Sequence, residues 1–511
     1  MAIKTLNQFA VPKEPNTIYT SPPLSTWAWG TLKNQHTMTT HKSNILDHRK
    51  ELLTIADQYT EKITKRKPAF EPNELIIATG HQPTWHHCGI FMKILLAHSL
   101  ARHLNASFLH VVLDHVICNT DLAIPKKTRN GIFETTNFKI NSCDTDSLLE
   151  TTSFSSTIKK SFIQSTIEYS PQNALCKTSW DNFNQTHHSA TDCITSLLSP
   201  LYTNLGIDVL YLPVSKLSES KAFQDYVTSL LIDFETFTDC YNSAIQKADI
   251  NNGISILGRK TISSNQFREF PLWVLTPERT QSTLLLSLDC DDTLILSTNT
   301  GTILHVGQKD THTVFEKLKR KGYALRPKAI LLTLFIRLYL SDWFIHGVGG
   351  SLYETINNFL LVDYFGINGL SYGVATFTSY LFGNDFVELK QYSDYLHEQY
   401  RSFRYNPETL MNHISNPSPK FQTLLTDKQK EISISKDQTQ SSESRKKARN
   451  KIKDINQKLQ HLLPLSEESI LNEINTLKQS LKVCGNREYF WGLFPREYFE
   501  SFLKVINEQL K

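Results

Sequence analysis

The chain has 511 residues, with 54 Lys and Arg against 50 Asp and Glu and a formal net charge of +4. This length predicts two or three domains rather than one core, and so small a positive excess argues against a nucleic-acid or membrane partner. Eight cysteines without a Cys-x-x-Cys pair, an N-terminus without a hydrophobic signal core, and no apolar stretch that could span a bilayer together predict a cytoplasmic protein.

Residues 1–74 are predicted to form an irregular arm and one helix. The arm is punctuated by Pro12, Pro15, Pro22 and Pro23. A polar helix is expected after it, at about residues 43–63.

The next segment has the pattern of a parallel strand–helix–strand unit. The apolar run Leu75–Ala78 turns polar after Gly80, as a buried strand does at its end, and residues 90–104 are good helix formers without proline. A second strand, at residues 108–113, ends at Asp114-His115. Ligands of parallel sheets bind beyond the carboxyl ends of the strands, beside a helix N-terminus. We therefore expect the chemistry at the ends of these two strands.

Residues 75–405 are predicted to form an α/β core with a parallel sheet. Residues from about 118 to 200 are rich in Ser, Thr and Asn and are read as an insertion. A third strand is expected at residues 209–215 and a helix at 219–248. Further strands are expected at residues 270–275, 284–288, 294–296 and 303–306, and further helices from about residues 313 and 329. The last of these helices is apolar, is interrupted by Arg337, and is expected to run as far as a Gly-rich turn after His346.

Residues 406–484 are predicted to form an α-helical antiparallel coiled-coil hairpin, and residues 485–511 to return to the core. Two apolar stripes have the spacing of a coiled-coil seam. The stripes are Ile452, Ile455, Leu459 and Leu462, and Ile470, Ile474, Leu477 and Leu481. Pro464 breaks the first helix and Ser466 can cap the second, so the stripes should fold back on each other. The polar residues 435–444 are expected to be disordered.

The hairpin also predicts an assembly. Two helices leave one side of each stripe exposed, at a cost of about 1.5–3 kcal/mol per aliphatic side chain. Pairing with the hairpin of a second chain would bury these side chains in a two-fold interface. We therefore expect a homodimer through the hairpin, with a helix pair packed on its own domain as the alternative.

The loop after the first strand is rich in histidine. Seven of the 18 His lie between residues 81 and 115, namely His81, His86, His87, His98, His103, His110 and His115. Imidazole binds zinc, but no His-x-x-x-His or zincin pattern occurs, so no metal site is predicted. His86 and His87 precede a helix N-terminus, which favours an anion site for a phosphate or carboxylate. The alternative is that these side chains, with Trp85, only cap the helix and cover the sheet edge.

A Gly-rich turn between two predicted helices is the second candidate site. Three glycines in four positions let a backbone approach a ligand closely, and Ser351 can cap the helix that follows. The glycines are Gly347, Gly349 and Gly350, and their polar neighbours are His346, Tyr353, Glu354 and, upstream, Arg326. A tight helix–helix turn is the alternative explanation.

Together with the charged hairpin, these two motifs resemble the bacillithiol-biosynthesis cysteine-adding enzyme family. Members open with a strand ending in Thr-Gly-Gln-Gln, similar to residues 79–82, and place a Lys on the next helix, similar to Lys93. The family's Arg-Pro segment and Gly-Gly-Pro-Gly-Glu loop resemble Arg326-Pro327 and residues 347–354. Of its acidic run after the second strand, this chain keeps Asp114-His115.

The resemblance implies a Rossmann-like core, a coiled-coil dimerisation arm, and amide formation between cysteine and a glucosaminyl-malate amine. The chain departs from the family at His81, where members have Gln, and at His86-His87-Cys88, where members have a Leu-Phe-Gly-Gly turn. Because these departures fall in the expected pocket, the amine or the acid of this chain can differ from the family's.

Amide formation needs an activated carboxylate, a stabilised oxyanion and a base for the amine proton. His81, or Asp114 with His115, is the predicted catalytic base. The other predicted site residues hold substrate or a nucleotide, with ATP or ADP as the candidate cofactor. They are Thr79, Gly80, Gln82, His86, His87, Lys93, Asn119, Arg326, His346, Gly347, Gly349, Gly350, Tyr353 and Glu354. Without a Walker loop, a nucleotide would bind at the sheet edge.

The sequence is also compatible with two other functions. A His-bearing loop between a first strand and its helix also grips phosphates in cytidylyltransferase-like families, although the His-x-Gly-His order is missing here. A scaffold that binds a metabolite or partner without catalysis is the non-enzymatic alternative, and the shortened acidic run favours it.

Overall fold

This computed structural model describes residues 11–41, 45–66, 75–140, 147–180, 189–249, 254–262, 265–289, 291–411 and 418–511. Parts of the predicted arm and insertion, residues 1–10, 141–146 and 181–188, lie outside the described residues, as do Cys143 and Cys290.

The chain divides into two compact units. Unit 1 comprises Met1–Ile124, Asn137–Ser379 and Arg487–Lys511, and unit 2 comprises Pro125–Thr136 and Tyr380–Asn486. The longer segment of unit 2 begins at Tyr380, whereas the sequence placed the start of the helical hairpin at residue 406.

The main sheet of unit 1 has six strands in the order β1-β14-β13-β2-β3-β6. All neighbours are parallel except β1, which is antiparallel to β14. The strands are β1 (Thr17–Ser21), β2 (Ile76–His81), β3 (Ser107–Val112), β6 (Leu210–Pro213), β13 (Trp343–His346) and β14 (Gly373–Thr378). The predicted α/β class with a largely parallel sheet is confirmed.

The strand order reverses between β2 and β13. From β2 the chain moves outwards to β3 and β6, then crosses to the other side of β2 and adds β13 and β14. Ligands of open α/β sheets bind beyond the carboxyl ends of the strands at such a reversal. Here the reversal lies between His81 and His346, the last residues of β2 and β13.

β13 occupies residues that the sequence assigned to an apolar helix. Instead, α11 (Ala329–Phe335) ends in a π-helical turn, Ile336–Leu340, and Trp343–His346 then pairs with β2. That part of the prediction is wrong, because a short apolar run suits a buried helix and a buried strand equally well.

A buried carboxylate joins β2 and β13 at their amino ends. Asp342 accepts a hydrogen bond from Ile76 N at 2.8 Å, and its own N–H donates to Ile76 O at 2.8 Å. Arg49 of α2 (Ile45–Thr64) donates to the same carboxylate at 2.8 and 3.1 Å. The pair is almost fully buried, so it sets which residues of the two strands face each other.

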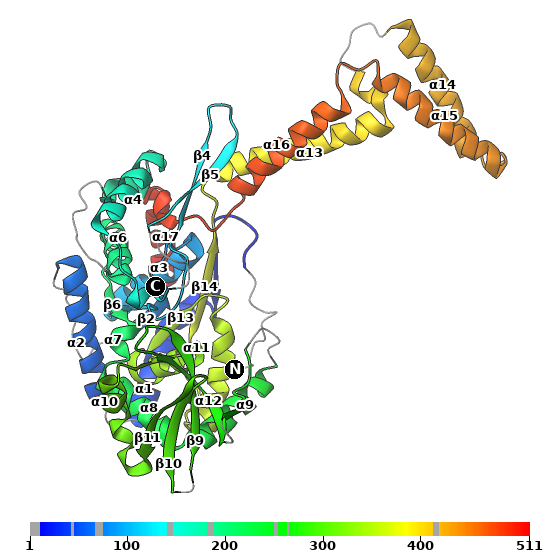
Figure 1. The fold of residues 1–511 in the computed structure, drawn as a ribbon. Coiled ribbons are helices and arrows are strands. Elements are labelled where there is room, and N and C mark those ends of the chain that lie inside the picture. The colour runs from blue at the N-terminus through cyan, green and yellow to red at the C-terminus, as the bar shows by residue number, and fades with distance from the viewer. Residues whose placement is uncertain are drawn as a thin grey trace. The chain divides into compact units, whose positions relative to one another are not determined.

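Alternate residues of the central strands face two different layers. Ile76, Ala78, Leu109 and Val111 enter the large core of unit 1. This core also contains residues of α2, α8 (Lys221–Ile232), α9 (Phe234–Ala248), α11 and α12 (Ser351–Asp363). On the other face, α3 (Cys88–Leu104) packs along β2, β3, β13 and β14 (Figure 1).

The strands predicted between residues 270 and 306 form a separate antiparallel sheet, in the order β11-β10-β9-β8-β12 with β7 beside β8. Its strands are β7 (Arg259–Ile262), β8 (Asn265–Leu275), β9 (Gln281–Leu288), β10 (Thr293–Thr298), β11 (Gly301–Gly307) and β12 (Ala324–Pro327). Apolar side chains of β8, β9 and β10 complete the large core.

The Ser/Thr-rich segment folds into short elements: β4 (Leu122–Lys127), β5 (Phe133–Phe138), α4 (Ser156–Tyr169), α5 (Leu175–Trp180) and α6 (Ala190–Asn204). The remaining helices of unit 1 are α1 (Trp27–His41), α7 (Val214–Leu217), α10 (Val314–Arg320) and α17 (Arg496–Gln509). Across the described residues, no helix combines the length and apolarity needed to cross a bilayer.

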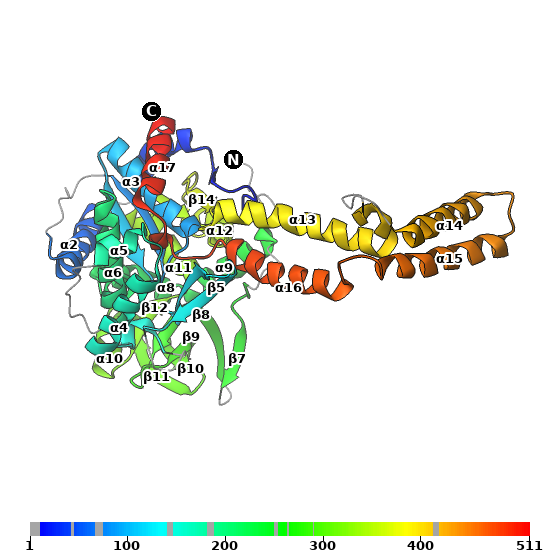
Figure 2. The ribbon, with the colours of Figure 1, turned by 90° about the horizontal axis from the view of Figure 1, so that it is seen from above.

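Unit 2 contains four long helices: α13 (Gly383–Tyr405), α14 (Pro419–Lys436), α15 (Ser442–Gln460) and α16 (Glu467–Cys484). α14 lies along α15, and α13 lies along α16 (Figures 1 and 2). Ser466 caps α16 as predicted, since its Oγ accepts from Ser469 N at 3.0 Å.

The predicted pairing of the two apolar stripes is wrong. Ile455 and Leu459 of α15 pack on Phe421 of α14, whereas the α16 stripe packs on Leu396 and Phe403 of α13. The hairpin turn lies at residues 437–441, within the segment expected to be disordered, and Asp437 Oδ1 accepts from Thr439 N there at 2.9 Å. The stripes therefore have partners inside unit 2.

This burial removes the reason for predicting a homodimer. Ile455, Leu459, Ile470, Ile474 and Leu477 are each at most 8% exposed within a single chain, so these side chains do not need a second copy to cover them. The dimer itself stays a prediction.

Replacing Leu459 by Ala should lower the free energy of unfolding of unit 2 by about 2–5 kcal/mol, because Leu459 is 0% exposed and its removal leaves a cavity. Hydrogen exchange of the α14 and α15 amides measures this loss. Leu471→Ala, at a 37% exposed position of α16, should change exchange little. If Leu459→Ala separated a dimer into monomers but did not speed up the exchange of the α14 and α15 amides, the result would contradict the packing role of Leu459.

Candidate functional site

The two sequence motifs meet where the strand order reverses. Thr79 and Ile345 are 266 residues apart in the chain, yet Thr79 Oγ1 donates to Ile345 O at 2.8 Å. The strands β2 and β13 are paired in parallel at this point, so their carboxyl ends lie side by side. The loop at residues 80–82 and the turn at residues 346–350 therefore border the same edge of the sheet.

Lys93 of α3 lies between the two motifs. Its Nζ donates to Gly80 O at 3.1 Å, and its Cδ lies 4.0 Å from where a Cβ on Gly347 would stand. The side chain is 5% exposed, and no carboxylate of the described residues forms an ion pair with it. Burial lowers the pKa of Lys93 to about 8. The Lys93 ammonium has three N–H donors, and Gly80 O is the one acceptor seen for it among the described residues. The other donors are available for a substrate anion.

His81 and His86 share one backbone acceptor. Gln82 O lies 3.2 Å from His81 Nδ1 and 2.8 Å from His86 Nε2, which assigns the ring protons to these nitrogens. The other nitrogen of each ring is then a proton acceptor. Burial, followed by repulsion from His86 and Lys93, holds the pKa of His81 well below its usual value. Partly exposed and neutral at pH 7, His81 has the properties of a general base.

His110 belongs to the same cluster, although the sequence did not assign it to the site. It stands opposite Thr79 in β3, and its ring centroid lies 6.1 Å from that of His86. Nδ1 of His110 and Nδ1 of His86 are buried and have no hydrogen-bond partner in the described part of the chain. The sequence did contain a signal for His110: Leu109 and Val111 face the core, so the residue between them on the strand faces the other side of the sheet.

His87 caps α3 instead of leaving its amides open. Its Nδ1 accepts from Gly89 N at 3.0 Å, while its backbone oxygen accepts from Ile90 N and Phe91 N. Burial, followed by the charges of Arg487 and Lys93, lowers the pKa of His87 to about 4. The sequence predicted that this helix end is open to an anion. Instead, the His87 imidazole already accepts the hydrogen bond from the Gly89 amide.

Glu354 is a structural carboxylate and not an open ligand group. It is 0% exposed, forms an ion pair with Arg337, and places Oε1 2.8 Å from His346 Nε2. Arg337 also donates to Asn358 Oδ1 at 3.1 Å and to Leu370 O at 2.9 Å. Burial opposes the charge of Glu354, but Arg337 and His346 outweigh it and lower its pKa to about 2. The lone Arg in an apolar segment was the signal for this pair.

The Gly-rich turn differs in detail from the prediction. Gly347, Gly349 and Gly350 do not adopt the left-handed backbone that favours glycine, and only a Cβ on Gly350 would clash, at 2.9 Å from His346 Nδ1. Gly350 is the N-cap of α12, and Ser351 Oγ donates back to Val348 O at 2.6 Å. Ser351 is therefore not the cap that the sequence predicted.

Asp114 lies beyond the end of β3 and is held by Ser215 at the start of α7. Ser215 N donates to Asp114 Oδ1 at 2.9 Å and Ser215 Oγ donates to Oδ2. Burial raises the pKa of Asp114 to about 6, even though Ser215 stabilises its ionised form. Both oxygens already have partners, so the carboxylate is less available as a base than His81.

Arg326 is similarly engaged, whereas the His115 ring keeps a buried Nδ1 without a hydrogen-bond partner in the described part of the chain. Arg326 Nη2 lies 2.8 Å from Glu150 Oε2, and both side chains are at most 7% exposed. The backbone oxygen of His115 accepts from Gln281 Nε2 at 3.1 Å, and burial lowers the pKa of the His115 ring to about 4. The idea that Arg326 holds a substrate anion is corrected, because Glu150 neutralises its charge; nothing in the sequence marked Glu150.

Two other predicted residues have their contacts elsewhere. Asn119 is exposed and its Oδ1 accepts from Asp121 N at 2.8 Å, which stabilises its own loop. Tyr353 is partly buried and packs against the large core of unit 1. Among the residues that the structure describes, no group of three His, Cys, Asp or Glu side chains is placed to hold a metal ion.

The fold and the site define a mixed α/β protein in which Lys93 lies buried among neutral histidines at the reversal point of the parallel sheet, without a carboxylate partner among the described residues. Comparison with protein-family models and with curated protein sequences gives no match for this chain. The family resemblance therefore depends on the short motifs alone.

Replacing Glu354 by Gln should lower the free energy of unfolding by about 3–5 kcal/mol, because Arg337 is left buried beside a neutral partner. Urea denaturation measures the change. Glu316→Gln breaks an exposed i,i+4 pair with Arg320 and should cost less than about 1 kcal/mol.

The same carboxylate should make stability depend on pH in the acid range. Its pKa falls from 4.5 to about 2 on folding, so the contribution is complete above about pH 4.5 and is lost as pH falls toward 2. Thermal denaturation between pH 5 and 2 should show a shallower decline for Glu354→Gln than for the natural chain. Equal slopes would show that the folded protein does not hold Glu354 ionised.

Proposed function

We propose that this chain is a carbon–nitrogen ligase that joins an amino acid such as cysteine to an amine, for instance that of an amino-sugar conjugate, by amide formation. It would be a divergent relative of the bacillithiol cysteine-adding enzymes with a Rossmann-like core. The order of the parallel strands supports this core, since β6-β3-β2-β13-β14 has the 3-2-1-4-5 arrangement of that fold.

The observation that carries the proposal is the meeting of the two motifs across Lys93. The segments that resemble the family are 266 residues apart in sequence and adjacent in space, and the lysine matched to the family's lies between them. If the resemblance were accidental, there would be no reason for two motifs so far apart in sequence to lie at the same edge of the sheet.

In the proposed reaction the acid's carboxylate lies against the Lys93 ammonium. His81 takes a proton from the amine as nitrogen attacks the carboxyl carbon, and Lys93 stabilises the oxyanion that develops. Water is a poor leaving group, so the proposal includes a nucleoside triphosphate: a carboxylate oxygen attacks its α-phosphorus and pyrophosphate leaves, which gives an acyl–nucleotide mixed anhydride. The C–N bond then forms as the bond between the acyl carbon and this oxygen breaks, and the oxygen leaves with the nucleoside monophosphate.

The two groups have complementary protonation states at pH 7. Lys93, with a pKa of about 8, is mostly charged, whereas His81 is neutral because its pKa lies well below 6.5. When one group of a site is protonated and another is unprotonated at the same pH, the two can act as acid and base in one reaction.

The geometry favours ligation over nucleotidyl transfer. Phosphate gripping by the His loop would need open imidazoles, whereas His86 is bonded to Gln82 O and His87 to Gly89 N. The cytoplasmic location and the homodimer stay part of the proposal.

Purified protein incubated with cysteine, glucosaminyl malate and ATP should form a product whose mass is the sum of acid and amine less one water. Mass spectrometry detects it, and a panel of other amino acids and amines defines the substrate pair. Release of pyrophosphate without any amide would favour the nucleotidyltransferase alternative. No turnover of any acid or amine would favour the non-catalytic scaffold.

Lys93→Ala should reduce the rate of amide formation at least about 100-fold, because the oxyanion loses its cation. In the natural chain, activity should fall as pH rises through about 8, since the charged form of Lys93 is lost there. Lys93→Arg, which keeps its charge, should shift this alkaline limb upward. Lys216→Ala, at a position 53% exposed, serves as the control; equal losses in both Ala variants would contradict the assigned role.

A further inference from the structure

The helices α14 and α15, which pack side by side in unit 2, carry more positive charge than the whole chain (Figure 2). Residues 419–460 contain 11 Lys and Arg against five Asp and Glu, a net charge of +6, whereas the full chain has +4. The rest of the chain therefore has a small negative excess. The overall charge argued against a nucleic-acid partner, but it averages over this uneven distribution.

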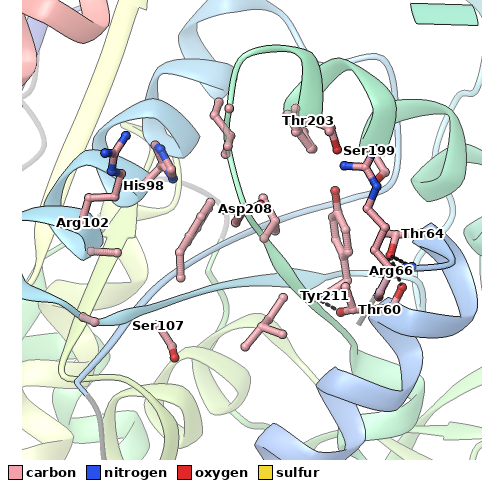
Figure 3. A pocket seen from close by; sticks show the side chains of 18 residues that line it. Thr60, Thr64, Arg66, His98, Arg102, Ser107, Ser199, Thr203, Asp208 and Tyr211 are labelled. Atoms are coloured by element: carbon pink, nitrogen blue, oxygen red, sulfur yellow. Dashed lines mark hydrogen bonds between the residues drawn. The ribbon is translucent and has the colours of Figure 1, made fainter. Parts of the chain in front are cut away.

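A cavity in unit 1 shows how differently cations are arranged there. It has a volume of about 700 Å³ and opens by the amino ends of β3 and β6. Arg66 and Arg102 lie on opposite sides of it, and Asp208 belongs to the same lining (Figure 3). These side chains form no continuous row of positive charge.

Three cations of α15 do form such a row. Lys446, Arg449 and Lys453 are exposed, and none of them forms an ion pair with a carboxylate of the described residues. Their spacing of three and four residues places them on one side of the helix, over about 10 Å of its length. Ile455 and Leu459, which pack on α14, point away from this side. We call the three cations the basic row.

The nearby carboxylates do not neutralise the basic row. Glu443 pairs with Lys447 at 2.9 Å, and Glu431 of α14 pairs with Lys451 at 2.9 Å. Asp454 lies about 100° around the helix from the nearest member of the row. Like charges three or four residues apart repel each other and destabilise a helix. A bound polyanion would remove this repulsion.

Two amide side chains extend the basic row. Asn450 and Gln457 are exposed, and with Lys446 and Lys453 they follow a spacing of 4, 3 and 4 residues along one line of α15. An ammonium group donates to phosphate oxygens, whereas an amide both donates and accepts, which suits the 2′-hydroxyl of ribose. Cations and amides thus alternate along the helix as phosphates and riboses alternate along an RNA strand.

The same helices lack the side chains that other polyanions need. The structure describes α14 and α15 throughout, and Phe421, their only aromatic residue, is buried. Single strands are held largely by stacking of bases on aromatic rings, so a duplex is favoured. No large apolar side chain of the two helices is exposed, whereas a helix that binds a bilayer surface presents apolar residues beside its cations.

We propose that this face of α15 docks on double-stranded RNA without regard to sequence. The basic row contacts phosphates of the duplex, and Asn450 and Gln457 contact ribose hydroxyls. This docking surface is independent of the proposed ligase activity, because Lys93 and His81 belong to unit 1.

Fluorescence anisotropy of the full chain with a labelled RNA duplex of about 20 base pairs tests the proposal. At about 50 mM salt the duplex should bind with a Kd of about 1–100 μM. Changing all three members of the basic row to Gln should weaken binding at least about tenfold. It should also reduce the slope of log affinity against log salt by about three, one for each lost phosphate contact. The melting temperature should stay equal or rise, because Gln keeps the helix and removes the repulsion.

A matched control removes the same charges elsewhere in unit 2. Lys390→Gln, Arg401→Gln and Lys478→Gln together change two Lys and one Arg at exposed positions of α13 and α16. This variant should bind the duplex within about twofold of the natural chain, because charges away from the contact are screened by salt. Equal losses of affinity in the two triple variants would overturn the assigned surface.

A DNA duplex of the same sequence should bind severalfold more weakly than RNA, and Asn450→Ala should reduce this difference. DNA binding as tight as RNA binding would overturn the choice of RNA. Absence of RNA binding at about 100 μM protein would overturn the proposal as a whole. Phosphatidylserine vesicles then test a membrane surface, and light scattering of the Gln variant tests an interface between copies of this chain.

Discussion

The structure of unit 1 depends on the buried Asp342, which joins β2 to β13. Its carboxylate accepts from Ile76 N and from Arg49, and its own amide donates to Ile76 O. These contacts make β13, which comes late in the chain, the neighbour of the first core strand. The reversal of strand order follows from that pairing, and so does the meeting of the loop after Thr79 with the turn after His346.

Charge is distributed unequally around this junction. The carboxylates that sequence reasoning placed in the site are satisfied by the protein itself: Glu354 by Arg337, and Asp114 by Ser215. Arg326 is likewise neutralised by Glu150. Lys93 is different, because it is buried, has no carboxylate partner among the described residues, and is surrounded by imidazoles that burial keeps neutral. A buried cation in such surroundings favours an anionic ligand, since a bound anion would compensate for its lost hydration.

α3 connects the two edges of the main sheet. Lys93 lies near its N-terminal end and reaches the reversal point, while His98 and Arg102, in its later turns, border the cavity at the amino ends of the strands. Phe91, two residues before Lys93, stacks on Trp491 with a centroid distance of 3.7 Å and on Tyr202 with a centroid distance of 5.9 Å. A rigid aromatic cluster thus supports the helix that carries both groups of residues.

The sequence by itself determined the elements whose signal is local. Apolar runs ending in polar residues marked β2 and β3, Ser466 marked the start of α16, and the loop after β2 marked the region of the site. Tertiary structure decided what depends on distant partners. Residues 343–346 became a strand because β2 and β14 hydrogen bond them on both sides, and the stripes of α15 and α16 packed on α14 and α13 rather than on each other. An apolar pattern specifies that a face is buried but not against which partner. Likewise, whether a charged side chain is available to a ligand depends on counter-charges such as Glu150 and Arg337, which only the folded chain brings near it.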